Sequence, residues 1–566
     1  MPRHSRLAIF ARVVLLPLLL SGGTVAGLGS YYETSDDATL TWFFAGVLAL
    51  KPVPSVPLYF HGYGHLLAAA YPAMPGVPWL GLLLCGLLAL ATMLIFAVLD
   101  RLLRPHWRGV GLALILVLFF GLGWVEHWLW FSHARVGVLL AGAAVLYAAQ
   151  RPARRSALLL GLAGVGAAWL LRPNLAVLGV GAALPAALLL AGSWRRAVPV
   201  VISVGLGLVL AGGAAAWRQT PAEARTQVND RFFAQVLDFE QLRPQPATPV
   251  DSLATSAIPL WLLGDATVTN EALPRRAYHF DAADFWGHTV PAKLALRAGL
   301  LVRDYFPLLL ALLATTVVLA RRPGRQPWFW FLQLSFFGGL VLLAGLLKLP
   351  PRLALPLLDC WLITNLIFWL KPAAATAVAA ARGGVPGSRR TAAETWSFSQ
   401  PMPRWLLAGA LLVGLAYGAK TLHRRQVLGQ ERGRHERALA EISTRTRTSG
   451  QVRVLSGPND LLKSLSPFRV YTLGPGPVLL LTGWPAHDPS QPLLRQQLAG
   501  TSDQTSCLRR LAASGCRVQW LFSAETAQWL NRRFRYGPAP GPALRLLPGA
   551  TLPADTTLRF YQPVFE

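Results

Sequence analysis

The sequence is poor in cysteine and in charged side chains. Its four cysteines, Cys85, Cys360, Cys507 and Cys516, form no Cys-x-x-Cys pair and no Cys/His zinc spacing. A disulfide framework and a structural zinc site are therefore not expected. Only 14% of the 566 residues are charged, whereas 53% are hydrophobic. A soluble multidomain protein does not have this composition, so we expect the chain to reside in a membrane.

Acidic residues are scarce, and the balance of charge is strongly positive. The chain has 53 Lys+Arg against 26 Asp+Glu, which gives a formal net charge of +27. In a soluble protein this excess would indicate a nucleic-acid partner. Here the basic residues fall where membrane topology would place them, and no basic–aromatic patch stands out. We therefore expect no nucleic-acid partner.

Long apolar runs are what the sequence has in abundance. A spanning helix needs about 20 mostly apolar residues. Eleven segments approach this requirement, although several are short or contain glycine and proline. They predict a polytopic α-helical membrane protein with about eleven transmembrane helices, at 8–29, 79–99, 109–126, 134–150, 156–171, 174–192, 197–217, 304–320, 327–347, 353–370 and 405–420.

The distribution of basic residues predicts how these helices are oriented across the membrane. If the N-terminus is cytoplasmic, the inside segments carry 18 basic residues and the short outside loops carry five. The positive-inside rule favours this orientation and an extracytoplasmic C-terminus. A cleaved signal peptide ending near Ala26 is an alternative for the first segment, and it leaves the downstream topology unchanged.

The predicted topology divides the chain into two domains. Residues 1–420 form a transmembrane domain with outside loops at 30–78 and 218–303, and residues 421–566 form a soluble extracytoplasmic domain. Apolar and helical patterns in the second domain predict a small α/β fold. The strands are expected at 451–455, 478–481, 518–522 and 558–564, and the helices at 507–513 and 525–534. Cys507 and Cys516 lie nine residues apart there, and both a disulfide and two separate thiols stay open.

The first outside loop contains the strongest functional signal. Glu33, Asp36 and Asp37 place three carboxylates within five residues, directly after a spanning helix. Such a cluster is costly unless a cation, a sugar or a catalytic role uses it. The alternative is an ordinary polar loop in which Ser35 or Asp36 caps a helix that begins near Ala38.

The chain as a whole resembles the GT-C superfamily of membrane glycosyltransferases, and most closely the bacterial family-39-like members. The resemblance is carried by the number of spans, by the acidic residues Glu33 to Asp37, by the proline-flanked Arg352, and by a soluble C-terminal domain on the same side. It implies a bacterial inner-membrane protein that moves a sugar, with inversion, from a polyprenyl-phosphate donor to an acceptor hydroxyl. The acceptor would be a glycan, a lipid or a protein on the periplasmic side.

The resemblance also assigns roles to residues of this sequence. Asp36 or Asp37 would be the general base, because an attacking hydroxyl needs a carboxylate within hydrogen-bond reach. The sequence does not decide between them, since adjacent residues at a helix start point about 100° apart. No cofactor is certain, and a divalent cation held by these two residues stays open. Further substrate-binding candidates are Glu33, Glu126, Arg135, Lys348 and Arg352, with Arg172 a weaker one.

The cationic candidates would stabilise the negative charge that develops on the leaving phosphate. Lys348 and Arg352 occupy one short outside turn, and anchoring at the membrane surface is their alternative role. The Trp-Trp-Asp signature of oligosaccharyltransferases is absent, which disfavours transfer to asparagine. Two other functions stay open: a lipid or glycan transporter or flippase, and a non-catalytic assembly protein.

Overall fold

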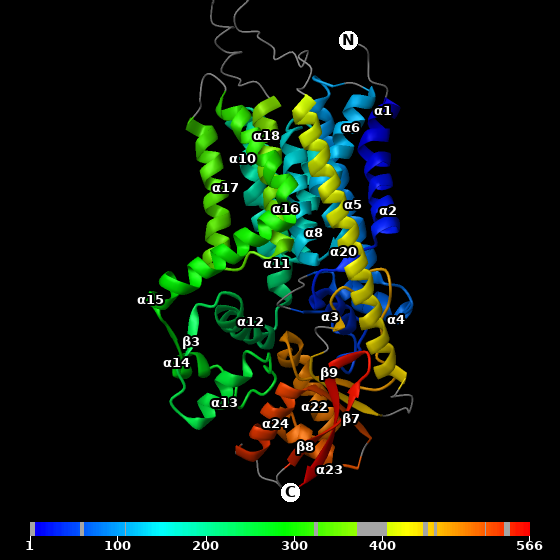
Figure 1. Ribbon diagram of the computed structural model, residues 1–566, viewed down its shortest axis with the longest axis vertical. Helices are drawn as coiled ribbons and strands as arrows, with labels where there is room; N and C mark the ends of the chain where they lie inside the picture. Colours follow the sequence, from blue (N-terminus) through cyan, green and yellow to red (C-terminus); the bar gives the residue numbers. More distant parts are fainter. Residues whose placement is uncertain are drawn as a thin grey trace, which may run out of the picture.

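A computed structural model describes residues 6–56, 62–107, 109–321, 327–370, 404–444, 451–457, 461–515, 517–536 and 544–565. The molecule is elongated, with a helical bundle at one end and a sheet with its helices at the other (Figure 1). The described chain starts at the far end of the bundle and ends in the sheet. The bundle and the sheet are joined by α20 and by a middle layer of shorter helices and loops.

The helical bundle accounts for most of the chain. Among the described residues, eight helical stretches are long and apolar enough to cross a membrane. The chain is thus a polytopic helical protein suited to a membrane, and the count of eleven spans stays a prediction. The eight stretches are Arg6–Leu28 (α1, η1 and α2), Trp79–Leu103 (α5), Gly109–Leu129 (α6, η2 and α7), Pro173–Ala191 (α10), Trp194–Trp217 (within α11, Trp194–Arg218), Ala282–Ala320 (α15, η4 and α16), Pro327–Leu346 (α17) and Pro351–Leu370 (α18). Two shorter apolar helices are His133–Ala149 (α8) and Arg155–Leu171 (α9).

Local sequence explains where several of these helices start and stop. The side chain of Ser132 accepts a hydrogen bond from the Ala134 backbone N–H and caps α8. Pro173 occupies the first position of α10, where a missing N–H costs nothing. Gly192 ends the same helix with φ +76°, a left-handed conformation that favours glycine.

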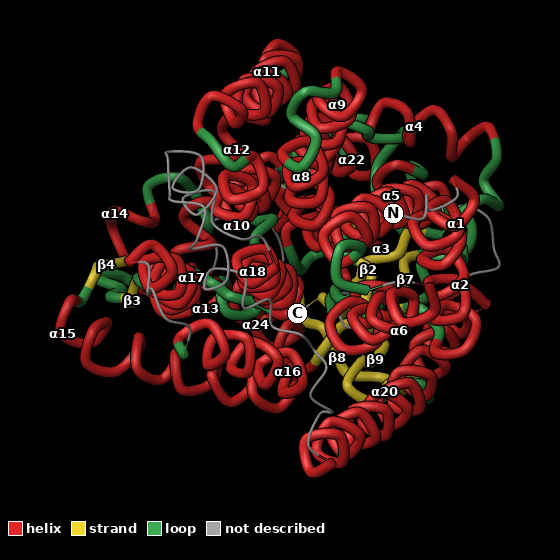
Figure 2. Tube along the Cα trace, turned by 90° about the horizontal axis from the view of Figure 1, so that it is seen from above, coloured by secondary structure: helices red, strands yellow, loops and turns green. Residues whose placement is uncertain are grey.

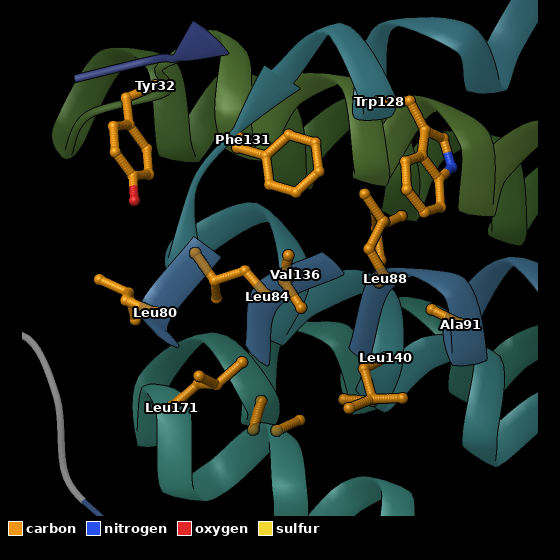
Figure 3. Packing of buried hydrophobic residues seen from close by; sticks show 14 of the residues in the cluster. Tyr32, Leu80, Leu84, Leu88, Ala91, Trp128, Phe131, Val136, Leu140 and Leu171 are labelled. Atoms are coloured by element: carbon orange, nitrogen blue, oxygen red, sulfur yellow. The ribbon is translucent and has the colours of Figure 1, made fainter. Parts of the chain in front are cut away.

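Helix α8 lies at the centre of the bundle, among α5, α9 and α10 (Figure 2). Almost all of its residues are buried. On α5, Leu80, Leu84, Leu88 and Ala91 recur at helical spacing and point toward the side chains of α8 and its neighbours (Figure 3). Small residues let the backbones approach, since a Cβ at Gly179 of α10 would clash with the Val138 carbonyl.

The middle layer lies between the bundle and the sheet, except that its helices α13 and α14 lie beside the sheet (Figure 1). It contains two short two-stranded pairings, of which the parallel β1–β2 pair joins the first loop to the turn before α8. Helix α12 begins with a capping box formed by Thr220 and Glu223. The elements of this layer are β1 (Tyr31–Tyr32), α3 (Ser35–Phe44), α4 (Gly64–Ala73), β2 (Trp130–Phe131), α12 (Pro221–Phe233), η3 (Ala234–Asp238), β3 (Leu242–Pro244), α13 (Pro249–Ala257), α14 (Leu273–Ala277) and β4 (Tyr278–Phe280).

A five-stranded mixed sheet lies at the C-terminal end, in the order β6-β5-β7-β9-β8. Strands β6, β5 and β7 are parallel, and β9 pairs antiparallel with β7 and β8. Four strands and two helices lie where the sequence predicts them, within a few residues. The elements are β5 (Val452–Leu455), β6 (Val478–Leu480), η5 (Trp484–His487), α22 (Ser490–Ala499), α23 (Gln504–Ala513), β7 (Val518–Ser523), α24 (Ala524–Tyr536), β8 (Leu544–Leu552) and β9 (Asp555–Phe565).

The sheet and the bundle share one hydrophobic core, which continues from α5 into β5, β6 and β7. Helix α5 approaches the C-terminal region so closely that a Cβ at Gly81 would clash with the Pro467 carbonyl. Helix α20 (Arg404–Thr444) runs unbroken from the bundle to the sheet (Figure 1). The predicted boundary between residues 420 and 421 falls inside this helix.

Candidate functional site

Asp36 lies at the start of α3, between the bundle and the sheet. The helix begins at Ser35, three residues before the predicted start, and its N-cap is Thr34 rather than Ser35 or Asp36. The Thr34 hydroxyl donates to Asp36 Oδ2 at 3.1 Å, and Trp484 Nε1 donates to Oδ1 at 3.2 Å. Arg352 approaches Oδ2 only to 3.9 Å. The Asp36 side chain keeps 15% of its surface exposed and therefore stays accessible.

Asp37 points the other way, into the protein, and is fully buried. Its Oδ1 accepts a hydrogen bond from the His133 backbone N–H at 2.9 Å and lies 2.9 Å from His133 Nδ1. Its Oδ2 is buried and has no hydrogen-bond partner in the described part of the chain. His133 continues the contact outward, with its Nε2 3.4 Å from Arg172. The two neighbouring aspartates thus face different surroundings.

Asp36 opens into a cavity of about 710 Å³, which we call the sheet cavity. One wall comes from the bundle side and contributes Lys348 and Arg352 together with Thr34 to Asp36. The opposite wall is the edge of the sheet where β5, β6 and β7 end. Residues on this second wall are Gly457, Thr482, Gly483, Trp484, Ser523, Ala524, Glu525, Thr526 and Thr557.

A second cavity, of about 600 Å³, reaches toward the membrane helices, and we call it the bundle cavity. It is lined by Arg172 and Asn174 at the turn between α9 and α10, by residues of α12 and η3, and by Leu353 of α18. Lys348, Arg352, Asp238, Trp261 and Trp484 line both cavities. The two cavities therefore meet at a cationic and aromatic junction.

Trp261 stands at this junction in a strained conformation. Its φ is +57°, a left-handed value that is unusual for a large side chain. Its carbonyl accepts a hydrogen bond from Gly483 N–H at 2.8 Å, which ties the loop after α13 to the sheet. Such strain costs on the order of 1–3 kcal/mol and concentrates at functional sites.

Two of the predicted cations reach this junction with partners of their own. Lys348 forms an ion pair with Asp238 of η3. Arg352, at the start of α18, keeps 17% of its side-chain surface exposed beside Asp36. Both side chains line the two cavities, so an anionic ligand in either cavity would meet positive charge.

Glu33 and Arg135 lie together away from both cavities. Arg135 is fully buried and donates to Glu33 Oε2 through Nε at 3.2 Å and Nη2 at 2.6 Å. Its Nη1 lies 3.1 Å from His127 Nδ1, and His127 Nε2 lies 2.8 Å from Asp359 Oδ2. These residues form a buried chain that runs from the first loop into the membrane helices.

Glu126 belongs to a second buried cluster. Its carboxylate is paired with Lys420 at 3.3 Å and Arg424 at 3.0 Å, both from α20, and it accepts from the Tyr417 hydroxyl. Arg424 also pairs with Asp304 at 2.8 Å. The structure thus places Glu126 and Arg135 in buried ion pairs, whereas Asp36, Lys348 and Arg352 line one cavity.

Sequence reasoning passed over several residues of the site. The tryptophans Trp261 and Trp484 carry no motif. His133 belongs to a polar cluster of the sequence, with Ser132 and Arg135, but only the fold brings it beside Asp37. Within the described residues, no group of three or more His, Cys, Asp or Glu side chains could hold a metal ion. The divalent cation near Asp36 and Asp37 stays a prediction. Cys516 lies outside the described residues, so the choice between a disulfide with Cys507 and two separate thiols stays open.

Outside the spans, Tyr32 is a buried tyrosine close to Asp37. Burial raises the pKa of Tyr32 well above its usual range, and the nearby Tyr71 and Asp37 raise it further. Its hydroxyl therefore stays protonated at neutral pH. Tyr32 is thus a hydrogen-bond donor and does not compete with a carboxylate for the role of base.

No family model, curated protein or solved structure matches the chain.

Proposed function

We propose that the protein is an integral-membrane glycosyltransferase that uses a polyprenyl-phosphate sugar, with Asp36 as its general base. The observation that carries the proposal is the different placement of the two aspartates. Asp36 is exposed to a cavity beside Arg352, whereas Asp37 is sealed and bound by His133. A base must reach its substrate, and of the two aspartates Asp36 alone lines one of the described cavities.

The reaction follows from these positions. An acceptor hydroxyl attacks the anomeric carbon, and its proton passes to the Asp36 carboxylate as the new C–O bond forms. The bond between the anomeric carbon and the phosphate oxygen breaks on the opposite face, which inverts the configuration. The electron pair leaves with the lipid phosphate. Arg352, Lys348 and Arg172 supply the positive charge that stabilises this leaving group.

The bundle cavity suits the donor because it combines these cations with an apolar side. Leu353, Phe233 and Phe239 line it together with Lys348, Arg352 and Arg172. A lipid phosphate presents the same combination of an anionic head and an apolar chain. Asp37 then acts as a positioning residue, since its bonds to His133 fix the first turn of α3.

The test is lipid-phosphate release from a panel of radiolabelled polyprenyl-phosphate sugars by the full chain in lipid nanodiscs, with and without chelator. Asp36→Asn should lower transfer at least about 100-fold, the usual scale for loss of a general base. Asp37→Asn should lower it less, because an amide can still accept from His133. Glu271→Gln, at an exposed residue outside both cavities, is the control and should be unchanged. Full activity of Asp36→Asn would contradict the proposal.

A transporter is the second candidate, and one observation favours it. Asp359 is buried within α18 and bound to His127, and its Oδ1 has no hydrogen-bond partner among the described residues. Ionisable residues inside membrane helices often belong to transport pathways. Movement of a labelled lipid-linked sugar across sealed vesicles, without a covalent product and lost in Asp359→Asn, would establish transport instead of transfer.

A further inference from the structure

The sheet cavity is built on the edge of the sheet where ligands bind in other α/β folds. Strands β5, β6 and β7 are parallel and end at Leu455, Leu480 and Ser523. On this side, Gly457, Thr482 and Ala524 line the cavity, one or two residues after these ends. In open α/β sheets, ligands occupy the crevice outside the carboxyl ends of parallel strands. In this chain the crevice faces Asp36.

Two glycines line this crevice, and hydrogen bonds hold the strand ends around it. Gly457 and Gly483 line it with φ +81° and +82°, so the chain turns sharply without a side chain that would fill the space. Gly457 N–H donates to Thr482 Oγ1 at 2.9 Å, and Ser523 N–H donates to Ser456 Oγ at 3.2 Å. These bonds hold the three strand ends to one another.

The chemistry of the sheet wall disfavours an anion. Within the described residues this wall contributes hydroxyls and the Glu525 carboxylate, and no lysine or arginine. Glu525 lies in the first turn of α24, where a bound phosphate would meet its charge. The Thr526 N–H at the same helix start already donates to Ser523 Oγ at 3.3 Å.

The same wall suits a sugar. The exposed side chains of Glu525 and Thr557 can exchange hydrogen bonds with sugar hydroxyls, and the indole of Trp261, which is 37% exposed, offers an apolar face to a pyranose ring. The cations lie on the opposite wall, where Lys348 is paired with Asp238 and Arg352 approaches Asp36. The cavity therefore has a side for the anionic leaving group and a side for a neutral polyol.

We propose that the sheet cavity is the acceptor subsite and that it takes a neutral saccharide, held by the strand ends with one hydroxyl toward Asp36. This assignment rests on the proposed glycosyl transfer for its role in a reaction. Binding of the saccharide itself requires no donor, so it is tested separately.

The test is saturation-transfer NMR on the full chain in lipid nanodiscs without donor, with methyl α-glucopyranoside, methyl α-mannopyranoside and cellobiose as probes. Thr557 of β9 lines the cavity and is exposed, and the neighbouring Thr556 is exposed outside it. Thr557→Trp should lower the signal of the neutral sugars at least about tenfold by filling the subsite, whereas Thr556→Trp should preserve it. Equal signals in the two variants, or no signal in the wild type, would overturn the assignment.

Charge selectivity provides a second measurement. Glucuronate should bind about threefold more weakly than the neutral methyl glucoside, the scale of one repulsive contact between exposed charges, and Glu525→Gln should remove the difference. Stronger binding of glucuronate than of the neutral sugar would contradict a neutral acceptor. Loss of sugar binding in Thr557→Trp together with full transfer by Asp36→Asn would overturn the proposed reaction and retain the saccharide site. The two proposals therefore fail independently.

Discussion

The cavity beside Asp36 and the buried chain beside Arg135 contain similar charged residues, but these differ in their exposure to solvent. Around Arg135 the guanidinium is fully buried and bonded to Glu33 and His127. At the cavity, Arg352 and Asp36 keep part of their surface exposed and stand 3.9 Å apart. Buried charges that pair with one another stabilise the packing of their elements, whereas charged groups that keep exposed surface beside a cavity can also contact a ligand. The two places differ in solvent access, not in residue type.

The largest expected effect comes from the removal of Arg135, which should destabilise the protein. Arg135→Met leaves the Glu33 carboxylate and His127 without their partner in a buried place. Breaking one side of a buried ion pair costs about 3–5 kcal/mol. We expect a large fall in the thermal unfolding temperature of the protein in nanodiscs. The double variant Glu33→Gln/Arg135→Met should recover part of the lost stability. If the double variant is no more stable than Arg135→Met, the two residues are not coupled.

The matching change at the cavity is Arg352→Gln. It should lower kcat/KM for the lipid-linked donor by about 10- to 100-fold, because a hydrogen bond to a charged group contributes about 1.5–3 kcal/mol. The unfolding temperature should barely change, since the side chain is partly exposed and its contact with Asp36 is long. Arg155→Gln, at an exposed residue that begins α9 and lines neither cavity, is the control. A fall in stability without a fall in activity would place Arg352 with the structural ion pairs.

The buried ion pair of Asp265 and Arg533, outside the spans, makes a prediction about how stability depends on pH. Burial alone would raise the pKa of Asp265, but hydrogen bonds and charge from Arg533, with hydrogen bonds from Thr267 and Thr505, hold it below its usual value. A lowered pKa contributes stability at pH values above the unfolded pKa of about 3.9, and the contribution is lost as pH falls through the folded value.

The expected outcome is local loosening in acid. Hydrogen exchange at α24 and at the segment around Asp265 should speed up below about pH 4. Asp265→Asn should show no such step, because it has no proton to gain. An identical acid step in both proteins would assign the effect to another group.

Much of the fold could be predicted because its patterns are local. The length of apolar runs located the helices of the bundle, and strand-like runs located β5, β6, β7 and β9 of the sheet. Strand β8 escaped prediction, since Pro548 and Gly549 interrupt it and much of it is exposed. The two-residue pairing of Tyr31 and Tyr32 with Trp130 and Phe131 also escaped, because it depends on helices far apart in sequence.

The candidate site could be predicted only in part. Charge and position in the sequence indicated Asp36, Asp37, Lys348 and Arg352. Which aspartate faces the cavity depends on the orientation of the first turn of α3, and the sequence does not reveal this orientation. Glu126 looks like Asp36 in sequence, as an acidic residue next to a membrane helix. Its partners Lys420 and Arg424 lie almost 300 residues later, so no local pattern reveals that its charge is already neutralised.

Helix α20 also has a mechanical consequence. Its 41 residues contain no proline, and at about 1.5 Å per residue they make a rod about 60 Å long. Ion pairs fasten this rod to the bundle through Glu126 and Asp304, and its far end contacts β9 of the sheet. The rod therefore links the bundle to the sheet through one continuous helix. We expect it to limit how far the strand ends can move from Asp36, and with that the size of the ligand that the sheet cavity can admit.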